Sequence, residues 1–175
     1  MLNSQSIPII SFVGFSGSGK TTLMTKVILA FKQKGYRVAS IKHDAHKFEM
    51  DHKGKDTWKF SQAGSDVVIV NSKEKLAMIE NLVQPISFEE VVTKVANVDV
   101  IFVEGYKHES PPKVLLVRRE SDLELLSKLE DVIAIVTSLS LTEKGIPIFD
   151  LNDEMGIVEF LQSKILGERK NGTRE

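Results

Sequence analysis

The sequence predicts an α/β protein with a mainly parallel sheet, helices on both faces and an added β-hairpin. Short, continuous apolar runs at 7–13, 98–103, 113–117 and 132–136 are typical of strands buried on both faces of a parallel sheet. Helical patterns alternate with these runs, as strand–helix–strand crossovers require. A glycine-rich turn joins the first strand to the first helix.

The first half of the chain contains two strands, two helices and a hairpin. A helix is expected over 21–34, because Leu23, Val27, Ala30 and Phe31 share one face. The second strand is expected at 36–41. A polar loop then leads to a short helix that Asp56 would cap and that ends near residue 64. Strands at 66–70 and 76–80 read as a hairpin.

The second half is expected to alternate strands and helices to the end. Ser87 with Glu90, and Ser121 with Glu124, form capping-box patterns before helices at 88–95 and 121–129. A short strand at 147–149 and a helix at 153–166 complete the pattern. Residues 167–175 are nearly without apolar side chains and are expected to fray. We therefore expect one domain over 1–166 and a flexible tail over 167–175.

Composition excludes several classes of protein. The 23 basic and 24 acidic residues give a net charge of -1, which argues against nucleic-acid binding by bulk charge and against a polybasic membrane binder. The absence of cysteine excludes disulfides, thiolate zinc sites, iron–sulfur clusters and a cysteine nucleophile. No apolar run is long enough to span a membrane, and the first residues lack a secretory pattern. A cytoplasmic protein without nucleic-acid or membrane partners is expected.

The turn after the first strand carries the pattern G-x-x-x-x-G-K-[ST]. In such a loop, glycines let successive N–H groups point at phosphate oxygens, and the helix that follows adds its positive N-terminal end. The lysine reaches the β- and γ-phosphates, and the hydroxyl is placed to bind Mg²⁺. The sequence therefore predicts a three-layer P-loop NTPase fold with a nucleotide held by Gly14, Ser16, Gly17, Ser18, Gly19, Lys20, Thr21 and Thr22.

A P-loop needs a carboxylate to hold the metal, and Glu104 is the best candidate. It follows the buried strand at 98–103, and Gly105 after it allows close backbone approach. Glutamate is longer than the aspartate found in most P-loop proteins, so direct contact and contact through a water both stay open. Asp99 lies at the wrong end of this strand for ligand binding. Lys20 and Glu104 are the candidate catalytic residues, and Thr21 and Glu104 the first candidate metal ligands.

Three of the four histidines fall in the loop after the second strand. Three interpretations stay open for this loop: a solvated surface segment, a histidine–carboxylate metal site, or an anion and metal site beside the P-loop. The second would use His43 and His46 with Asp44 or His52. The third is favoured, and it would use Lys42, Lys47, Lys53 and Lys55 for phosphates and Asp44 for Mg²⁺.

Four segments together resemble a known family. They are Gly14–Leu23, Lys42–His46, Gly54–Trp58 with Ala63-Gly64, and Glu104–Lys107, in this order. The combination resembles the molybdopterin-guanine dinucleotide biosynthesis protein B family, MobB, from residue 7 to about 140. The resemblance implies a small homodimeric GTPase that hydrolyses GTP slowly. It also implies a role in assisting the guanylyltransferase that attaches GMP to molybdopterin.

These expectations define the ligands and partners. GTP and Mg²⁺ are the expected cofactors, and the molybdenum cofactor guanylyltransferase is the expected protein partner. Lys42, His43 and Lys107 are further candidate binding residues, because their location and charge suit a second anionic ligand such as the phosphate of molybdopterin.

The residues depart from the usual GTPase pattern at one place. Many P-loop GTPases recognise guanine with Asn-Lys-x-Asp after a late strand, but residues 136–140 contain no aspartate. Guanine preference therefore follows from the resemblance alone. An ATP-dependent small-molecule kinase, or a ligase similar to dethiobiotin synthetase, is the rival interpretation, and a nucleotide-gated adaptor without meaningful catalysis is the third. Arg118 and Arg119 are the only candidates for a kinase's basic lid, and solvent-exposed charges are the preferred interpretation of both.

Overall fold

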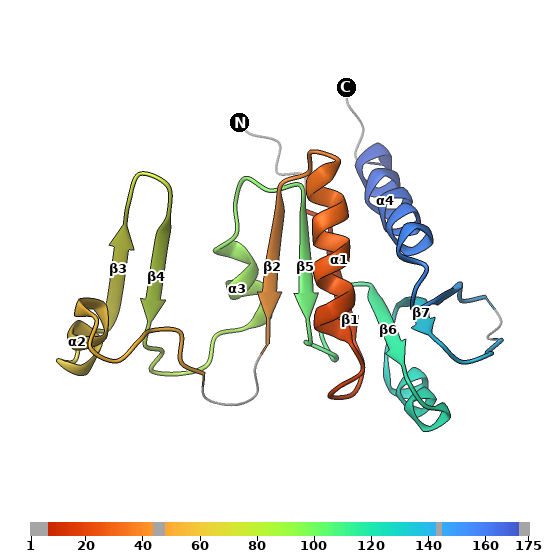
Figure 1. Ribbon diagram of the computed structural model, residues 1–175, viewed down its shortest axis with the longest axis horizontal. Helices are drawn as coiled ribbons and strands as arrows, with labels where there is room; N and C mark the ends of the chain where they lie inside the picture. Colours follow the sequence, from red (N-terminus) through yellow and green to blue (C-terminus); the bar gives the residue numbers. More distant parts are fainter. Residues whose placement is uncertain (1–6, 44–47, 143–144, 172–175) are drawn as a thin grey trace. The chain divides into compact units, whose positions relative to one another are not determined.

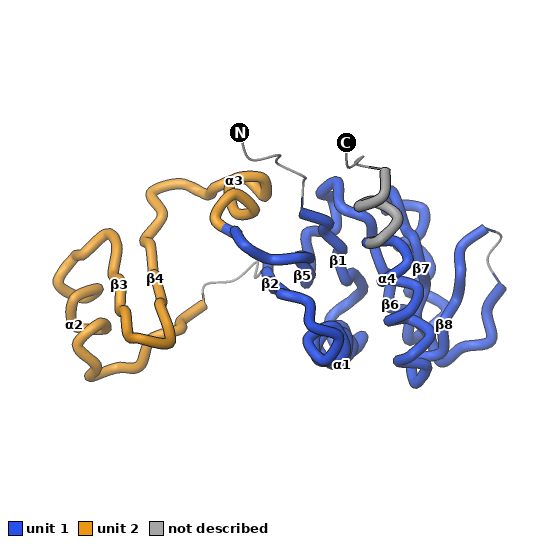
Figure 2. The backbone as a smooth tube through the Cα atoms, turned by 90° about the horizontal axis from the view of Figure 1, so that it is seen from above, with its two compact units in different colours: residues 1–43, 95–175 blue, residues 44–94 orange. Residues whose placement is uncertain are grey.

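The computed structural model describes residues 7–43, 48–142 and 145–171. The chain forms two compact units, which are shown in different colours in Figure 2. The first contains residues 1–43 and 95–175, and the second contains residues 44–94. The sequence analysis did not separate the two.

A six-stranded sheet forms the centre of the first unit, in the order β2-β5-β1-β6-β7-β8. Every neighbouring pair is parallel, so the predicted parallel sheet is confirmed. The arrowheads of β2, β5 and β6 point to one end of the sheet, and the chain leaves β1 there (Figure 1). The strands are β1 (Ile9–Val13), β2 (Val38–Lys42), β5 (Val100–Glu104), β6 (Lys113–Val117), β7 (Val132–Thr137) and β8 (Ile148–Asp150).

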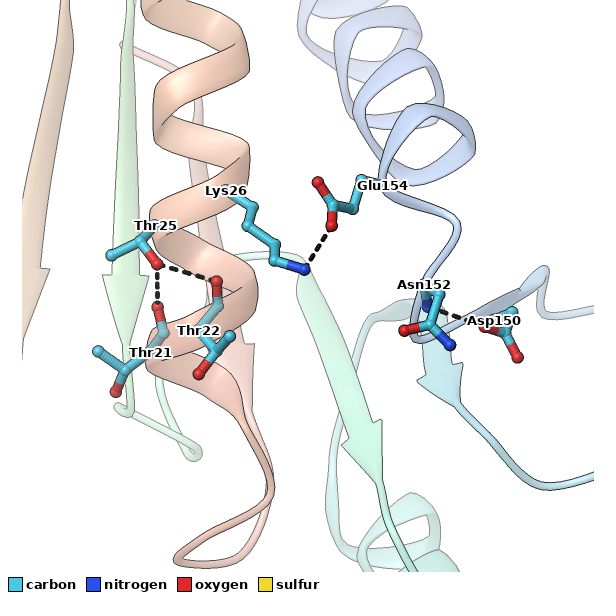
Figure 3. A network of polar contacts seen from close by, with 7 residues as sticks. All are labelled: Thr21, Thr22, Thr25, Lys26, Asp150, Asn152 and Glu154. Carbon is cyan, nitrogen blue, oxygen red and sulfur yellow. Dashed lines mark hydrogen bonds and ion pairs between the residues drawn. The ribbon is translucent and has the colours of Figure 1, made fainter.

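Two helices cover one face of this sheet: α1 (Lys20–Gln33) and α4 (Glu154–Asn171). Alternate strand residues point into this layer, as the two-residue repeat of a strand requires. Phe12, Phe31 and Phe102 meet there edge to face, with ring centroids 5.1–5.8 Å apart. An ion pair between Lys26 and Glu154 joins the two helices (Figure 3). Helix α4 extends beyond the end expected at 166.

The opposite face carries a smaller apolar cluster under a 3₁₀ helix, η1 (Glu120–Lys128). The predicted cap at Ser121 is wrong. Asp122 instead accepts hydrogen bonds from the N–H groups of Arg118 (2.9 Å) and Arg119 (3.2 Å). Asp122 is 6% exposed, so a nearly buried carboxylate holds the turn after β6.

The second unit contains the predicted hairpin and two short helices. Strands β3 (Val67–Asn71) and β4 (Leu76–Glu80) pair antiparallel, between α2 (Asp56–Gln62) and α3 (Phe88–Thr93). The capping box of Ser87 and Glu90 is confirmed, with both reciprocal bonds present. Asp56 is not the cap of α2, because Lys55 is the N-cap residue and Asp56 is the first helical residue. Within the part of the chain that the structure describes, no helix is long and apolar enough to cross a membrane.

Candidate phosphate-binding site

The P-loop follows β1 and packs against the end of β6. A Cβ atom at Gly14 would lie 2.8 Å from the Leu116 carbonyl oxygen and 2.8 Å from Ser18 Oγ, so only glycine fits there. Gly19 is the N-cap of α1 and has a φ of 96°, a left-handed conformation that favours glycine. The tight turn therefore depends on two glycines of the motif for different reasons, space and backbone angle.

The loop presents backbone donors at the N-terminus of α1. Among the described residues, the N–H groups of Gly17 and Gly19 have no hydrogen-bond partner. Such donors, together with the positive end of the helix, suit a phosphate group. The Lys20 ammonium lies over the loop, donating to the carbonyls of Phe15 (2.8 Å) and Gly14 (3.2 Å). Partial burial lowers the pKa of Lys20, and Lys107 and Lys42 lower it further, while Glu104 acts in the opposite direction.

Glu104 lies at the end of β5, the strand beside β1. The Thr21 hydroxyl donates to Glu104 Oε2 over 2.7 Å, and the Glu104 side chain is only 13% exposed. The two are 83 residues apart in sequence and meet because β5 pairs with β1. Hydroxyl and carboxylate oxygens are hard ligands that suit Mg²⁺, so the residues present fit a magnesium ion at this place.

Two further lysines approach the same end of the sheet. Lys42 Nζ lies 3.8 Å from Glu104 Oε1. Lys107 Nζ lies 5.2 Å from the centroid of the Phe15 ring, within the P-loop. Three of the predicted cationic residues, Lys20, Lys42 and Lys107, therefore gather at the P-loop.

His43 lies beside this cluster but packs against an aromatic ring. Its N–H donates to the Glu104 carbonyl (2.9 Å), and its ring stacks on Tyr106 with centroids 4.4 Å apart. A Cβ atom at Gly105 would lie 3.2 Å from His43 Cβ, so glycine permits this approach. Burial raises the pKa of Tyr106, with a smaller contribution from Glu109.

Several residues predicted for the histidine loop cannot be placed around the P-loop. Asp44, His46 and Lys47 lie outside the described residues. His52, Lys53 and Lys55 belong to the second unit. Over the described ranges, no group of three His, Asp or Glu side chains is arranged to hold a metal ion.

The sequence analysis preferred a solvent-exposed charge as the interpretation of Arg118, yet this side chain touches the P-loop. Arg118 Nε donates to the Ser18 carbonyl over 2.9 Å, and an Nη atom lies 3.0 Å from where a Cβ of Gly19 would be. The available signal was its position directly after a buried apolar strand, on the ligand-binding side of an α/β sheet.

The parallel sheet, the glycine turn and the Lys20–Thr21–Glu104 arrangement define a protein of the P-loop nucleotide-binding class. Sequence comparison identifies the family within this class. Residues 9–138 match the family described as "MobB: Molybdopterin guanine dinucleotide synthesis protein B". The chain belongs to the MobB family, and the predicted resemblance is confirmed.

Known relatives cover nearly the whole chain. The chain is 35% identical to the molybdopterin-guanine dinucleotide biosynthesis adapter protein of Haemophilus influenzae, over 93% of this chain and 91% of the relative. It is 30% identical to the adapter protein of the same name from Escherichia coli, over 92% and 95%. The solved structure of a MobB homologue from Bacillus stearothermophilus has 27% identity and a TM-score of 0.74, over 91% of this chain and 98% of that one.

Proposed function

We propose that this protein binds GTP with Mg²⁺, hydrolyses it slowly, and acts as an adapter in the biosynthesis of molybdopterin-guanine dinucleotide. The observation that supports this most directly is the hydrogen bond from Thr21 to Glu104 beside Lys20. It puts two oxygen ligands and a phosphate-binding cation at one end of the P-loop. The relatives' names support the biosynthetic role.

Each group of the loop has a distinct task in this proposal. Backbone N–H groups from Ser16 to Thr22 bind the β-phosphate, and Lys20 offsets charge on the β- and γ-phosphates. Thr21 and Glu104 would hold Mg²⁺, with Asp44 as a further candidate. An ion held there would supply positive charge that neutralises the charge developing on the phosphates.

Slow hydrolysis is supported by what surrounds Glu104. Its carboxylate accepts a hydrogen bond from the Thr21 hydroxyl. It therefore points toward the proposed metal site and not toward an attacking water. The following segment, 105–112, contains no glutamine that could orient an attacking water. We therefore expect a low intrinsic rate, as suits an adapter.

A preference for guanine is supported by the end of β8. The parallel register pairs Asp150 with Thr137 at the end of β7. A carboxylate from β8 therefore lies beside the segment 136–140, which has no aspartate of its own. Asp150 Oδ1 accepts from the N–H of Asn152 (2.8 Å, Figure 3), and the side chain is exposed. β8, which carries Asp150, lies three strand spacings from β1, about 14 Å, a distance that an α-phosphate, a ribose and a base together can span. A carboxylate there can accept from the N1 and N2 hydrogens of guanine, and adenine has no hydrogen at either position.

The decisive experiment compares GTP with ATP. Dissociation constants should be measured with Mg²⁺ for the wild type, Lys20→Ala and the control Lys32→Ala, which changes a lysine in the last turn of α1. We expect tighter binding of GTP than of ATP and at least about a tenfold loss for Lys20→Ala only. Equal affinities, or tighter ATP binding, would contradict the guanine preference. Asp150→Asn should weaken the binding of GTP and strengthen the binding of xanthosine triphosphate, because the amide nitrogen donates a hydrogen bond where the carboxylate oxygen accepted one.

The same nucleotides separate an adapter from a kinase. Phosphate release should be followed with GTP and ATP, with and without the molybdenum cofactor guanylyltransferase. Slow release with GTP, changed by the transferase, is expected. Rapid transfer from ATP to a small-molecule acceptor would favour the kinase instead.

Molybdopterin is the proposed second ligand. Lys42 and Lys107 supply positive charge beside the nucleotide site, and the Lys42 side chain is 62% exposed. The double variant Lys42→Ala and Lys47→Ala should bind molybdopterin more weakly than the wild type. Unchanged affinity would exclude this assignment.

A homodimer is the proposed assembly, with the hairpin of the second unit as its interface. On one face of the hairpin, Val67, Ile69, Leu76 and Met78 are 44–66% exposed, and Ile69 lies directly opposite Met78. A two-stranded hairpin is marginal alone, and such a face is typical of an interaction surface. Ile69→Lys with Met78→Lys should halve the mass seen by light scattering. Leu29→Lys, at an equally exposed position of α1 (59%), should not, and a monomeric wild type would contradict the proposal.

A further inference from the structure

Arg118 is a second cationic residue at the P-loop, on the side opposite Glu104. The sheet order places β5 on one side of β1 and β6 on the other. Glu104 ends β5, whereas Arg118 directly follows β6. Its Nε donates to the Ser18 carbonyl and its Nη lies against Gly19. The P-loop is therefore flanked by a carboxylate at one edge and a guanidinium at the other.

Arg118 is held in place both at its backbone and at its guanidinium group. Its backbone N–H donates to the nearly buried Asp122 carboxylate (2.9 Å), and β6 before it is buried along its whole length. At the other end, the Ser18 carbonyl fixes the guanidinium. A long side chain fixed in this way loses little further entropy when it meets a ligand.

Among the described residues, no carboxylate forms an ion pair with the Arg118 guanidinium. The side chain is exposed. Only one of the five guanidinium N–H groups is used by the bond to Ser18. A flat, charged group with free donors and an accessible face therefore lies at the rim of the P-loop.

The orientation of a bound nucleotide decides what this group meets. Thr21 and Glu104 mark the side where Mg²⁺ and the γ-phosphate would lie. A nucleoside triphosphate is a linear chain, so its nucleoside leaves the loop on the opposite side, over the ends of β6 and β7. Arg118 lies on that side.

We propose that Arg118 contacts the nucleoside of the bound nucleoside triphosphate, with the plane of its guanidinium against the base. The inference rests on the proposed nucleotide binding and adds a residue that recognises the nucleoside rather than the phosphates. Arginine stacks on aromatic rings through its planar guanidinium, and lysine cannot reproduce this. Ser18 and Asp122 position the group, so the stacking face exists before the nucleotide arrives.

The test compares a ligand that has a nucleoside with one that lacks it. Affinities for GTP and for inorganic tripolyphosphate, both with Mg²⁺, should be measured for the wild type, Arg118→Gln and Arg118→Lys. Arg118→Gln keeps a donor for the Ser18 carbonyl, and Arg118→Lys keeps the charge. Both variants should bind GTP about 3- to 30-fold more weakly than the wild type, the range of a cation–π contact. Their affinity for tripolyphosphate should stay within twofold of the wild-type value. The matched control is Arg119→Ala, which removes the neighbouring exposed arginine and should change neither affinity.

Each outcome has a definite meaning. Equal losses for GTP and tripolyphosphate would show that Arg118 only shapes the loop, and would overturn the inference. The inference would also fail if Arg118→Lys retained wild-type GTP affinity, since charge alone would then suffice. A wild type that binds GTP no more tightly than tripolyphosphate would overturn it while leaving phosphate binding intact. A wild type that binds neither would overturn the proposed function itself.

Discussion

The hydrogen bond between Thr21 and Glu104 permits a sharp test of the metal site. Thr21→Val removes the hydroxyl and keeps the shape of the side chain. The bond is short, at 2.7 Å, and its acceptor is a carboxylate that is 13% exposed. A hydrogen bond to a charged group contributes about 1.5–3 kcal/mol. If the hydroxyl binds Mg²⁺ when nucleotide is present, a loss of this size weakens Mg²⁺-dependent GTP binding about 10- to 100-fold.

Thr25→Val is the matched control, because it removes the same group one turn along the same helix. The Thr25 hydroxyl donates only to the carbonyls of Thr21 and Thr22, each at 2.9 Å (Figure 3). Affinity for a fluorescent GTP analogue should be measured for both variants, in excess Mg²⁺ and in EDTA. We expect a loss for Thr21→Val in Mg²⁺ only, and none for Thr25→Val. Equal losses in Mg²⁺ and EDTA would refute a role at the metal.

Three stability predictions follow from the packing. Gly14→Ala should lower the free energy of unfolding by about 2–4 kcal/mol, because its Cβ would meet the Leu116 carbonyl. Gly17→Ala, where the space is open, should lower it by only about 1–2 kcal/mol. Equal losses for the two variants in urea unfolding would contradict this prediction. Lys113 is 1% exposed, and burial lowers its pKa in the folded protein. At pH values between that lowered pKa and about 10.4, the pKa of an unperturbed lysine, the unfolded chain therefore binds more protons than the folded protein does. Stability should therefore rise with pH through this window in the wild type, and Lys113→Met should remove that rise. Ser87→Ala should cost about 1 kcal/mol by removing the cap of α3, with Ser87→Asp retaining most of it in the same unfolding assay.

Local signals predicted most elements of the fold. The apolar run before Gly14 became β1, and the run before Glu104 became β5, since strands buried on both faces of a parallel sheet are short continuous apolar segments. The capping box at Ser87 was correct because both its partners lie within four residues. The cap at Ser121 was wrong, because the nearly buried Asp122 carboxylate took the free N–H groups of the turn instead.

Contacts between distant residues were less predictable. The P-loop motif predicts a metal carboxylate, and Glu104 was chosen for that role because it follows the only strongly apolar strand that ends in an acidic residue and a glycine. The structure places Glu104 against the Thr21 hydroxyl. The position of Arg118 after a buried apolar strand put it on the ligand-binding side of the sheet, but no sequence pattern pairs it with Ser18, 100 residues away. That contact depends on β6 lying next to β1, and strand order is a property of the whole sheet.

The sequence by itself determined the P-loop, because its glycine turn, lysine and hydroxyl stand at fixed spacing within one short segment. It also indicated the family, through four short segments in one order, and the family match over residues 9–138 confirms it. Only the tertiary structure decided which side chains flank the loop, since parallel pairing brings the ends of β5 and β6 to either side of β1. The carboxylate at one edge and the guanidinium at the other are adjacent to the loop only because the strands that carry them are adjacent to its strand.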